Sequence, residues 1–522
     1  MAPRASGREG LIPLRKEACP GLRICHDFCG MSEAIRSLEP SALWNRFADL
    51  NAIPRPSKKE DRIRAWVMQY CTDLGMDVDR DEVGNVLVRK PATPGMADRS
   101  TVILQSHLDM VCQKNADTVF DFDTEGIRML IDKSGDWVCA DGTTLGADNG
   151  IGAATMLAVL ESTDIVHPAL ECLFTIDEET GMTGALELRK NWLKGTVLLN
   201  LDTEDDREIG IGCAGGVDLT FSGRYDAVSP SASHGIHVVI NGGSGGHSGM
   251  DIQKGIANAN KVLVRILREL SKKGAVEIAS LDGGGLRNAI PREAFAVLAT
   301  DRSAEQCTSE LAKLTSEISK EYAFTDPNLK IAFSEVPQPT AVIPCDIADR
   351  LLKALDVCPN GLDRMSDIPG LVQTSNNLAR IDVSAGQISV LCLTRSSVDS
   401  EKDDHARRIS AGFELAGLTT QSDGTYPGWA PNASSPTVDL LAALYEKRFG
   451  EKPLILACHA GLECGILGNR YPGLDMASIG PNITGPHSPD EKVQISSVQK
   501  FWGWFLEVLA HIPVEKKAAA QV

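Results

Sequence analysis

The sequence lacks any apolar run that approaches the ~18 residues a membrane-spanning helix needs. Its longest apolar stretches, such as Ala154 to Leu160, are typical of a buried helix. Basic residues are too few to balance the acidic ones, with 52 Lys and Arg against 70 Asp and Glu and a formal net charge of −18. A surface this acidic repels phosphate backbones and anionic lipids, so we expect neither nucleic acid nor membrane as a partner.

Cysteine is also scarce, with 14 in 522 residues and none in a C-x-x-C pair. This usage excludes a disulfide scaffold and favours reduced thiols in the cytoplasm. The first thirty residues have no continuous apolar stretch of the secretory type. We expect residues 1–30 to be a flexible N-terminal extension of a cytoplasmic protein.

Hydrophobic residues make up 43% and charged residues 23% of the chain, which is the balance of a globular protein. From residue 80 onward short β-rich runs alternate with helical ones, which predicts an α/β domain with a predominantly parallel central sheet. After residue 213 the pattern changes to that of an α+β insert. We therefore predict a discontinuous domain, residues 31–213 and 423–522, interrupted by an insert at residues 214–422.

Acidic and histidine side chains stand where predicted strands end. In open α/β sheets the carboxyl ends of the strands form the ligand crevice, so these side chains are expected to converge. A lone Asp at a strand end is usually a helix cap, and an adjacent Glu pair is usually a solvated surface pair. The conjunction is what indicates a site, and its members are His107, Asp109, Asp148, Glu178, Glu179, Asp202 and His487.

Two histidines with several carboxylates are a suitable ligand set for a pair of divalent ions such as Zn²⁺, Co²⁺ or Mn²⁺. One Asp can bridge two ions through its two oxygens, and a carboxylate left over can take a proton from water. The residues alone therefore indicate a two-metal hydrolase.

The segments SHLDMV, LGADNGIG, TIDEETGM, NLDTED and TGPHSPDE resemble the ordered motifs of the M20 metallopeptidases. Together with HSGMDI and HAGLECG, they resemble the aminoacyl-histidine dipeptidase branch of that family. The resemblance runs from Met31 to the C-terminus. It implies a zinc-aminopeptidase-like catalytic domain, with the insert as a lid.

The resemblance also implies roles for the clustered residues. Glu178 is then the general base, and Asp109 orients His107. A cis peptide bond is implied between Asp148 and Asn149. The implied ligands of two metal ions, Zn²⁺ or else Co²⁺ or Mn²⁺, are His107 and Asp202 for one ion, Glu179 and His487 for the other, and Asp148 as the bridge.

Four further residues are candidates for binding substrate. By resemblance, His247 in the glycine-rich segment GGSGGHSGMD stabilises an oxyanion. Asn288 and Arg395 are then substrate-binding residues, and the guanidinium of Arg395 binds the carboxylate of the substrate. Glu463 in HAGLECG carries a separate hypothesis, that its carboxylate pairs with the free ammonium of a dipeptide.

The expected function is metal-dependent hydrolysis of Xaa-His dipeptides, including β-alanyl-histidine, and of other small dipeptides. An N-acyl-amino-acid deacylase using the same two metals stays open, as does a protein that binds metal or peptide without catalysis. The resemblance makes a homodimer an expectation as well.

Overall fold

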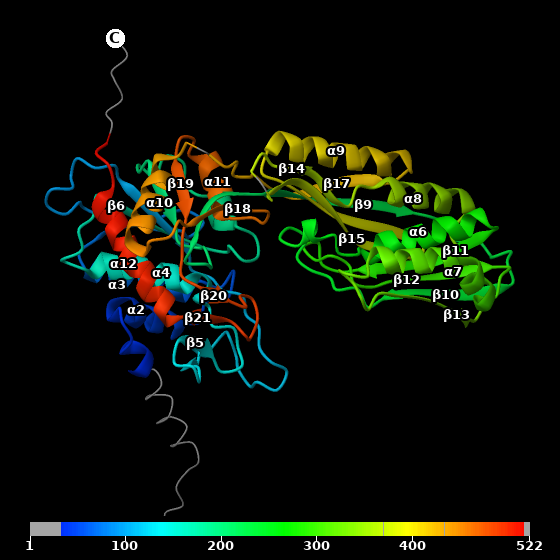
Figure 1. The fold of residues 1–522 in the computed structure, drawn as a ribbon, viewed down its shortest axis with the longest axis horizontal. Coiled ribbons are helices and arrows are strands. Elements are labelled where there is room, and N and C mark those ends of the chain that lie inside the picture. Colours follow the sequence, from blue (N-terminus) through cyan, green and yellow to red (C-terminus); the bar gives the residue numbers. More distant parts are fainter. Residues whose placement is uncertain (1–32, 369, 433, 516–522) are drawn as a thin grey trace, which may run out of the picture.

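The computed structural model describes residues 33–368, 370–432 and 434–515, so the prediction for residues 1–30 lies outside the described residues. Figure 1 shows two bodies side by side along the long axis of the molecule, each built on its own sheet. The body with both ends of the described chain holds an eight-stranded sheet. The other body is the insert, which we define as residues 215–426.

The eight-stranded sheet is mixed, and its parallel strands lie in the centre. The pairs β6–β3, β3–β7 and β7–β19 are parallel, whereas β2 is antiparallel to β6 and β8 is antiparallel to β19. The carboxyl ends of the central strands therefore meet at one edge. The strand order is β1 (Asp77–Arg80), β2 (Val86–Lys90), β6 (Leu170–Thr175), β3 (Val102–His107), β7 (Val197–Asn200), β19 (Asp475–Ser478), β8 (Glu208–Cys213) and β18 (Leu454–Cys458).

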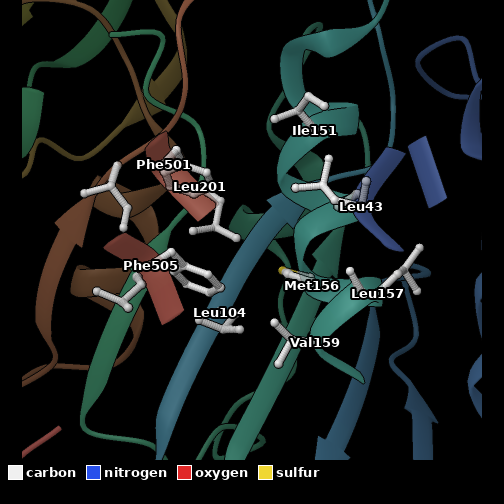
Figure 2. Close-up of a cluster of buried hydrophobic side chains, with 14 of the residues drawn as sticks. Leu43, Leu104, Ile151, Met156, Leu157, Val159, Leu201, Phe501 and Phe505 are labelled. Atoms are coloured by element: carbon white, nitrogen blue, oxygen red, sulfur yellow. The ribbon is translucent and has the colours of Figure 1, made fainter. Parts of the chain in front are cut away.

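Helix α4 (Ala147–Glu161) is the central helix of this body and is buried along nearly its whole length. Its sequence is almost entirely apolar, which is what a helix enclosed on all sides requires. Figure 2 shows Met156 and Val159 of α4 beside Leu104 of β3, with Phe505 of the last helix across the core. The helices packed around this core are α2 (Ser41–Asn51), α3 (Asp61–Asp73), α10 (Pro436–Phe449) and α12 (Ile495–His511), and the short α5 (Thr183–Leu186) and α11 (Glu463–Arg470) complete the body.

In the chain, helix α4 follows β3 and precedes β6, and these two strands are parallel neighbours in the sheet. A helix in such a crossover runs back against the strands, so its first turn lies at their carboxyl ends. This placement brings Asp148, near the start of α4, to the edge where β3 and β6 end.

The insert is an antiparallel sheet covered by four helices, which agrees with the α+β insert that the sequence pattern predicts. Its core is continuous from the strands to the helices α6 (Ala259–Lys272), α7 (Ala304–Glu321), α8 (Cys345–Val357) and α9 (Asp399–Leu415). The strand order is β13 (Lys330–Val336), β10 (His234–Asn241), β12 (Ala294–Thr300), β11 (Val276–Gly284), β15 (Val372–Ser384), β16 (Gln387–Ser396), β9 (Gly215–Arg224) and β17 (Thr419–Tyr426), with β14 (Gly361–Met365) beside β15.

Two neighbouring segments connect the insert to the other body. Cys213 and Trp429 exchange both backbone hydrogen bonds, at 3.0 and 2.9 Å. A Cβ at Gly215 would lie 2.5 Å from the backbone nitrogen of Gly428, so this close approach requires glycine. The last strand of the insert ends at Tyr426, beyond the boundary predicted at residue 422.

A small four-stranded sheet brings the C-terminal region to the start of α4. Its order is β20 (Ile483–Thr484), β21 (Lys492–Gln494), β5 (Trp137–Ala140) and β4 (Met129–Ile131). The loop that carries His487 runs between β20 and β21 and so lies near the segment that leads from β5 into α4.

Among the described residues, no helix is long and apolar enough to cross a membrane. The eleven cysteines in this part of the chain are all free.

Candidate active site and metal centre

The ends of the central strands carry the candidate residues, as the pattern predicted. His107 is the last residue of β3, and Asp109 follows it by two positions. Glu178 and Glu179 follow β6, and Asp202 follows β7. Because β6, β3 and β7 are parallel neighbours, these side chains gather at one edge of the sheet.

Asp148 lies at the centre of the cluster and faces both imidazoles. Its Oδ1 is 3.1 Å from His107 Nε2, and its Oδ2 is 3.3 Å from His487 Nε2. Each histidine also faces a second carboxylate, with Asp202 Oδ1 3.6 Å from His107 Nε2 and Glu179 Oε2 3.0 Å from His487 Nε2. Two groups of one imidazole and one carboxylate thus lie on either side of a shared carboxylate.

The peptide bond between Asp148 and Asn149 is cis, as the resemblance implied. The Asn149 side-chain amide donates to Asp202 Oδ1, which links the start of α4 to the end of β7.

Asp109 lies behind His107 and is fully buried. Its Oδ1 is 3.3 Å from His107 Nδ1, and its carboxylate accepts hydrogen bonds from the Ser57 hydroxyl and from the backbone N–H groups of Glu178 and Glu179. Burial raises the pKa of Asp109, but the hydrogen bond and charge of His107, followed by the hydrogen bonds from Ser57 and Glu178, outweigh burial and leave the pKa lowered. An ionised Asp109 favours the proton on Nδ1 of His107, so that Nε2, which faces the cluster, is the nitrogen that would bind a metal ion once it is deprotonated.

The remaining carboxylates repel one another. Burial, and then the charges of Asp202 and Glu179, raise the pKa of Glu178 well above its usual range. Hydrogen bonds to Asp148 and Glu179 raise the pKa of His487 to about 11. Five carboxylates around two imidazoles leave an excess of negative charge that divalent cations would neutralise.

The donor set fits metal binding in a second respect. Ligand atoms of His107, Asp148 and Glu179 all lie within 4.8 Å of one another. Glu179 Oε1 is buried and has no hydrogen-bond partner among the described residues. Imidazole nitrogen with carboxylate oxygen is the ligand set of Zn²⁺ and its neighbours, so the residues present fit a pair of such ions.

The insert places His247 against the other body. A Cβ at Gly249 would lie 2.0 Å from the carbonyl oxygen of His459, and Ser375 of the insert is hydrogen-bonded to the His459 ring at 2.7 Å. His247 Nδ1 accepts hydrogen bonds from the backbone N–H groups of Gly249 and Met250. An imidazole that accepts at Nδ1 carries its proton on Nε2, so His247 can donate from that atom.

His247 is neutral over most of the pH range. Burial, and then the charge of Arg395, lower its pKa to about 4. A neutral donor suits a developing oxyanion, which was the predicted role.

Asn288 and the two glutamates line one cavity. This cavity has a volume of about 370 Å³ and lies between the bodies, with Glu178 and Glu179 on one side and Asn288, Asp218 and Tyr426 among the other lining residues. Arg395 is almost entirely buried next to it, and its Nη1 donates to the Tyr426 hydroxyl at 2.9 Å. Of the predicted substrate residues, Asn288 lines the cavity directly, and Arg395 reaches it through Tyr426.

Glu463 is not placed as the sequence predicted. Its side chain is 0% exposed and accepts hydrogen bonds from Gln105 and Thr175, both at 2.6 Å, beneath the strand ends. It does not line the cavity beside Glu178. The expected pairing with a substrate ammonium is therefore wrong for this arrangement, because other side chains enclose the carboxylate.

The sequence pattern did not indicate two buried charged residues of the site, Glu491 and Arg55. Glu491 accepts four backbone hydrogen bonds at the start of α4, and Arg55 binds backbone carbonyls on both sides of the cluster. The available signal for Glu491 was its place in TGPHSPDE, four residues after His487. Arg55 follows α2 in an ordinary polar segment and had no comparable signal.

A sequence model of peptidase family M20/M25/M40 matches residues 103–511. The chain belongs to this family. It is 43% identical to the cytosol non-specific dipeptidase of Escherichia coli K12 over 488 residues, which cover 93% of this chain and 100% of that protein.

Solved structures agree with this assignment. The crystal structure of aminoacylhistidine dipeptidase from Vibrio alginolyticus has a TM-score of 0.84 and 42% identity, over 92% of this chain and 99% of that one. Aminopeptidase PepT from Bacillus cereus, 16% identical with a TM-score of 0.53 over 91% of this chain and 99% of that one, shares the fold. The predicted family, the α/β fold class and the prediction of a peptide hydrolase are confirmed.

Proposed function

We propose that this chain is a two-metal dipeptidase that hydrolyses Xaa-His dipeptides, β-alanyl-histidine among them, together with other small dipeptides. The observation that carries the proposal is the position of Asp148, which presents one oxygen to His107 and the other to His487 beside Glu178. The substrate class rests on two relatives of at least 42% identity that are named dipeptidases and match nearly the whole chain.

In this proposal the residues around Asp148 hold two ions, and Zn²⁺ is the metal that suits them best. When bound, the ions supply Lewis acidity, which polarises a carbonyl and lowers the pKa of a water molecule. The ligand set is His107 and Asp202 for one ion, Glu179 and His487 for the other, and Asp148 for both.

Glu178 moves the proton. Its carboxylate takes a proton from the attacking water and delivers it to the amine nitrogen as the peptide C–N bond breaks. His247 donates from Nε2 to the carbonyl oxygen, on which negative charge develops. Arg395 binds the substrate carboxylate through its planar guanidinium, and Asn288 positions the substrate in the cavity.

The eight-stranded body is then the catalytic domain and the insert is its lid. The cavity supports this division, because Glu178 lines it from one body and Asn288 from the other. Its volume of about 370 Å³ suits a small substrate. We place the enzyme in the cytoplasm, in keeping with the cytosolic relative and the free cysteines of the described chain.

The test is hydrolysis by chelator-treated protein with Zn²⁺, Co²⁺ or Mn²⁺ added back. The substrates are β-alanyl-histidine, other Xaa-His dipeptides, other dipeptides and N-acetyl amino acids. Glu178→Gln is measured beside Glu305→Gln, which changes an exposed glutamate on α7 of the insert.

Metal-restored cleavage of dipeptides that Glu178→Gln lacks and Glu305→Gln keeps is the expected result. General acid–base catalysis contributes about 10²–10⁴-fold, which sets the expected loss in kcat. Cleavage of the acylated substrates alone would instead identify a deacylase. Metal binding without any cleavage would leave a binding protein.

A further inference from the structure

Arg55 carries a buried charge whose partners are neutral oxygens. The side chain is 2% exposed, although an arginine is rarely enclosed without a carboxylate in contact. Its Nη1 donates to the carbonyl oxygens of Leu108 and Asp109 at 3.0 and 3.1 Å. Its Nη2 donates to the carbonyl oxygen of Gly146 at 2.6 Å and to Asn51 Oδ1 at 2.9 Å.

These bonds join the two segments that carry the centre of the metal site. Leu108 and Asp109 directly follow His107, and Gly146 comes two residues before Asp148. The guanidinium therefore spans from the end of β3 to the start of α4. It thereby holds the two segments at the separation that places His107 Nε2 3.1 Å from Asp148 Oδ1.

Glu491 holds the same segment of α4 from its amide side. Its Oε2 accepts from the N–H groups of Leu145 and Gly146 at 2.7 and 2.9 Å, and its Oε1 accepts from those of Ala147 and Asp148 at 2.7 and 3.2 Å. A carboxylate that takes four N–H groups is a strong anchor, since hydrogen bonds to a charged group are stronger than neutral ones. Glu491 also belongs to the loop of His487, so it ties the second histidine to the bridging carboxylate.

The glycines of LGADNGIG make room for the guanidinium. A Cβ at Gly146 would lie 2.5 Å from Arg55 Nη2, and one at Gly150 would lie 2.7 Å from the same atom. Any side chain at either position would displace Arg55.

We propose that Arg55 and Glu491 are positioning residues of the metal centre. A buried cation that binds the carbonyl of Gly146 and a buried anion that binds the N–H groups of residues 145–148 fix the carboxylate of Asp148 between His107 and His487. The proposal rests on the metal centre proposed above. Neither residue belongs to the proposed ligand set, and neither lines the cavity assigned to the substrate.

Lysine cannot replace Arg55 in this position. An ammonium group is a point donor and cannot reach the carbonyls of both segments, whereas the guanidinium fork does so from fixed positions. In Glu491→Gln the carboxamide nitrogen faces backbone N–H groups that need an acceptor. Both changes should loosen Asp148 without altering a ligand.

The test is Co²⁺ binding to the chelator-treated full chain, followed by elemental analysis and by the visible absorption of the bound ion. The variants are Arg55→Lys and Glu491→Gln. The matched control is Arg46→Lys, which changes a partly buried arginine on α2, the helix packed against α4. Steady-state kcat and KM are measured on the same samples, and thermal unfolding of each metal-free variant is recorded.

We expect both variants to fold and to bind both Co²⁺ ions about 10–100-fold more weakly, because the proposed centre shares Asp148 between the ions and such a loss is typical when a residue supporting a ligand is changed. The Co²⁺ absorption should change in shape, and kcat should fall while KM stays constant. Arg46→Lys should match the unmodified chain in every respect.

Co²⁺ affinity and absorption identical to the unmodified chain in both variants would overturn the proposal. So would equal losses in Arg46→Lys, or a failure of both variants to fold, since either would assign the residues to general stability. The Co²⁺ titration measures metal binding independently of catalytic activity. If the chain proves not to cleave dipeptides, the binding data still decide whether Arg55 and Glu491 position the metal ligands.

Discussion

Asp148 Oδ2 lies 3.3 Å from His487 Nε2, although Asp148 belongs to the first turn of the central helix and His487 to a loop near the C-terminus. The contact depends on the small sheet in which β21 pairs with β5, next to the segment that leads into α4. The other oxygen of the same carboxylate faces His107 at 3.1 Å. One short side chain thus connects three segments that are far apart in the sequence.

The first prediction follows from this connection. Asp148→Asn should lower metal content and activity by more than the ~10–100-fold that is typical when a residue supporting a ligand is changed. The loss should be larger because the amide lacks the negative charge that Asp148 would share between the two ions. Elemental analysis and dipeptide hydrolysis measure the two effects. Asp141→Asn, at an exposed position shortly before it, is the control and should change neither. Full metal content and activity in Asp148→Asn would contradict the bridging role.

The sequence was sufficient to place the side chains at the strand ends. His107 and Glu178 follow runs that are apolar enough to be central strands, and parallel strands bring their carboxyl ends to one edge. Asp148 could be assigned only because its motif resembles that of a family. Periodicity alone does not distinguish it from a helix cap.

The sequence could not reveal the supporting contacts. Arg55 binds backbone carbonyls at positions 108, 109 and 146, and no local pattern marks a residue that acts on distant backbone. Glu463 was assigned from its charge, but its burial depends on how α11 packs over the strand ends. The boundary of the insert was misplaced for a similar reason. The segment TYPGWAPN has the composition of a linker, yet Tyr426 pairs with Gly216 in the sheet.

A second prediction concerns His247. His247→Ala should lower kcat by about 10²–10³-fold with a smaller effect on KM, since a donor to the developing oxyanion acts mainly in the transition state. His234→Ala changes an exposed histidine at the start of β10 and should leave both constants unchanged. A rise in KM without a fall in kcat would instead show that His247 binds the ground state. Because the pKa of His247 is lowered to about 4, its titration should not appear in the pH profile above pH 5.

A third prediction concerns Arg395. Arg395→Met should raise KM for dipeptides with a free carboxylate by about 10–100-fold, since a hydrogen bond to a charged group contributes about 1.5–3 kcal/mol. Dipeptide amides, which lack that charge, should be affected much less. Arg380→Met, on the neighbouring strand of the insert, is the control for loss of an arginine. Equal effects on acids and amides would assign Arg395 to supporting Tyr426 alone.

The last prediction uses the buried carboxyl of Glu463. Burial raises its pKa from 4.5 to about 8, so the folded protein binds a proton there that the unfolded chain releases above pH 4.5. The contribution of Glu463 to stability is therefore complete below pH 4.5 and is lost as the pH rises to about 8. Glu463→Gln cannot ionise, so the metal-free variant should lose less stability than the unmodified chain between pH 5 and pH 8.

Urea unfolding of both proteins at several pH values, with chelator present, measures this difference. Parallel curves would show that Glu463 titrates as it does in the unfolded chain. The same variant also decides the role first predicted for this residue. If Glu463 contacts the substrate ammonium, Glu463→Gln should raise KM for dipeptides more than for N-blocked analogues. If Glu463 is enclosed by Gln105 and Thr175, the substitution should change KM for both kinds of substrate to the same extent, and we expect this second result.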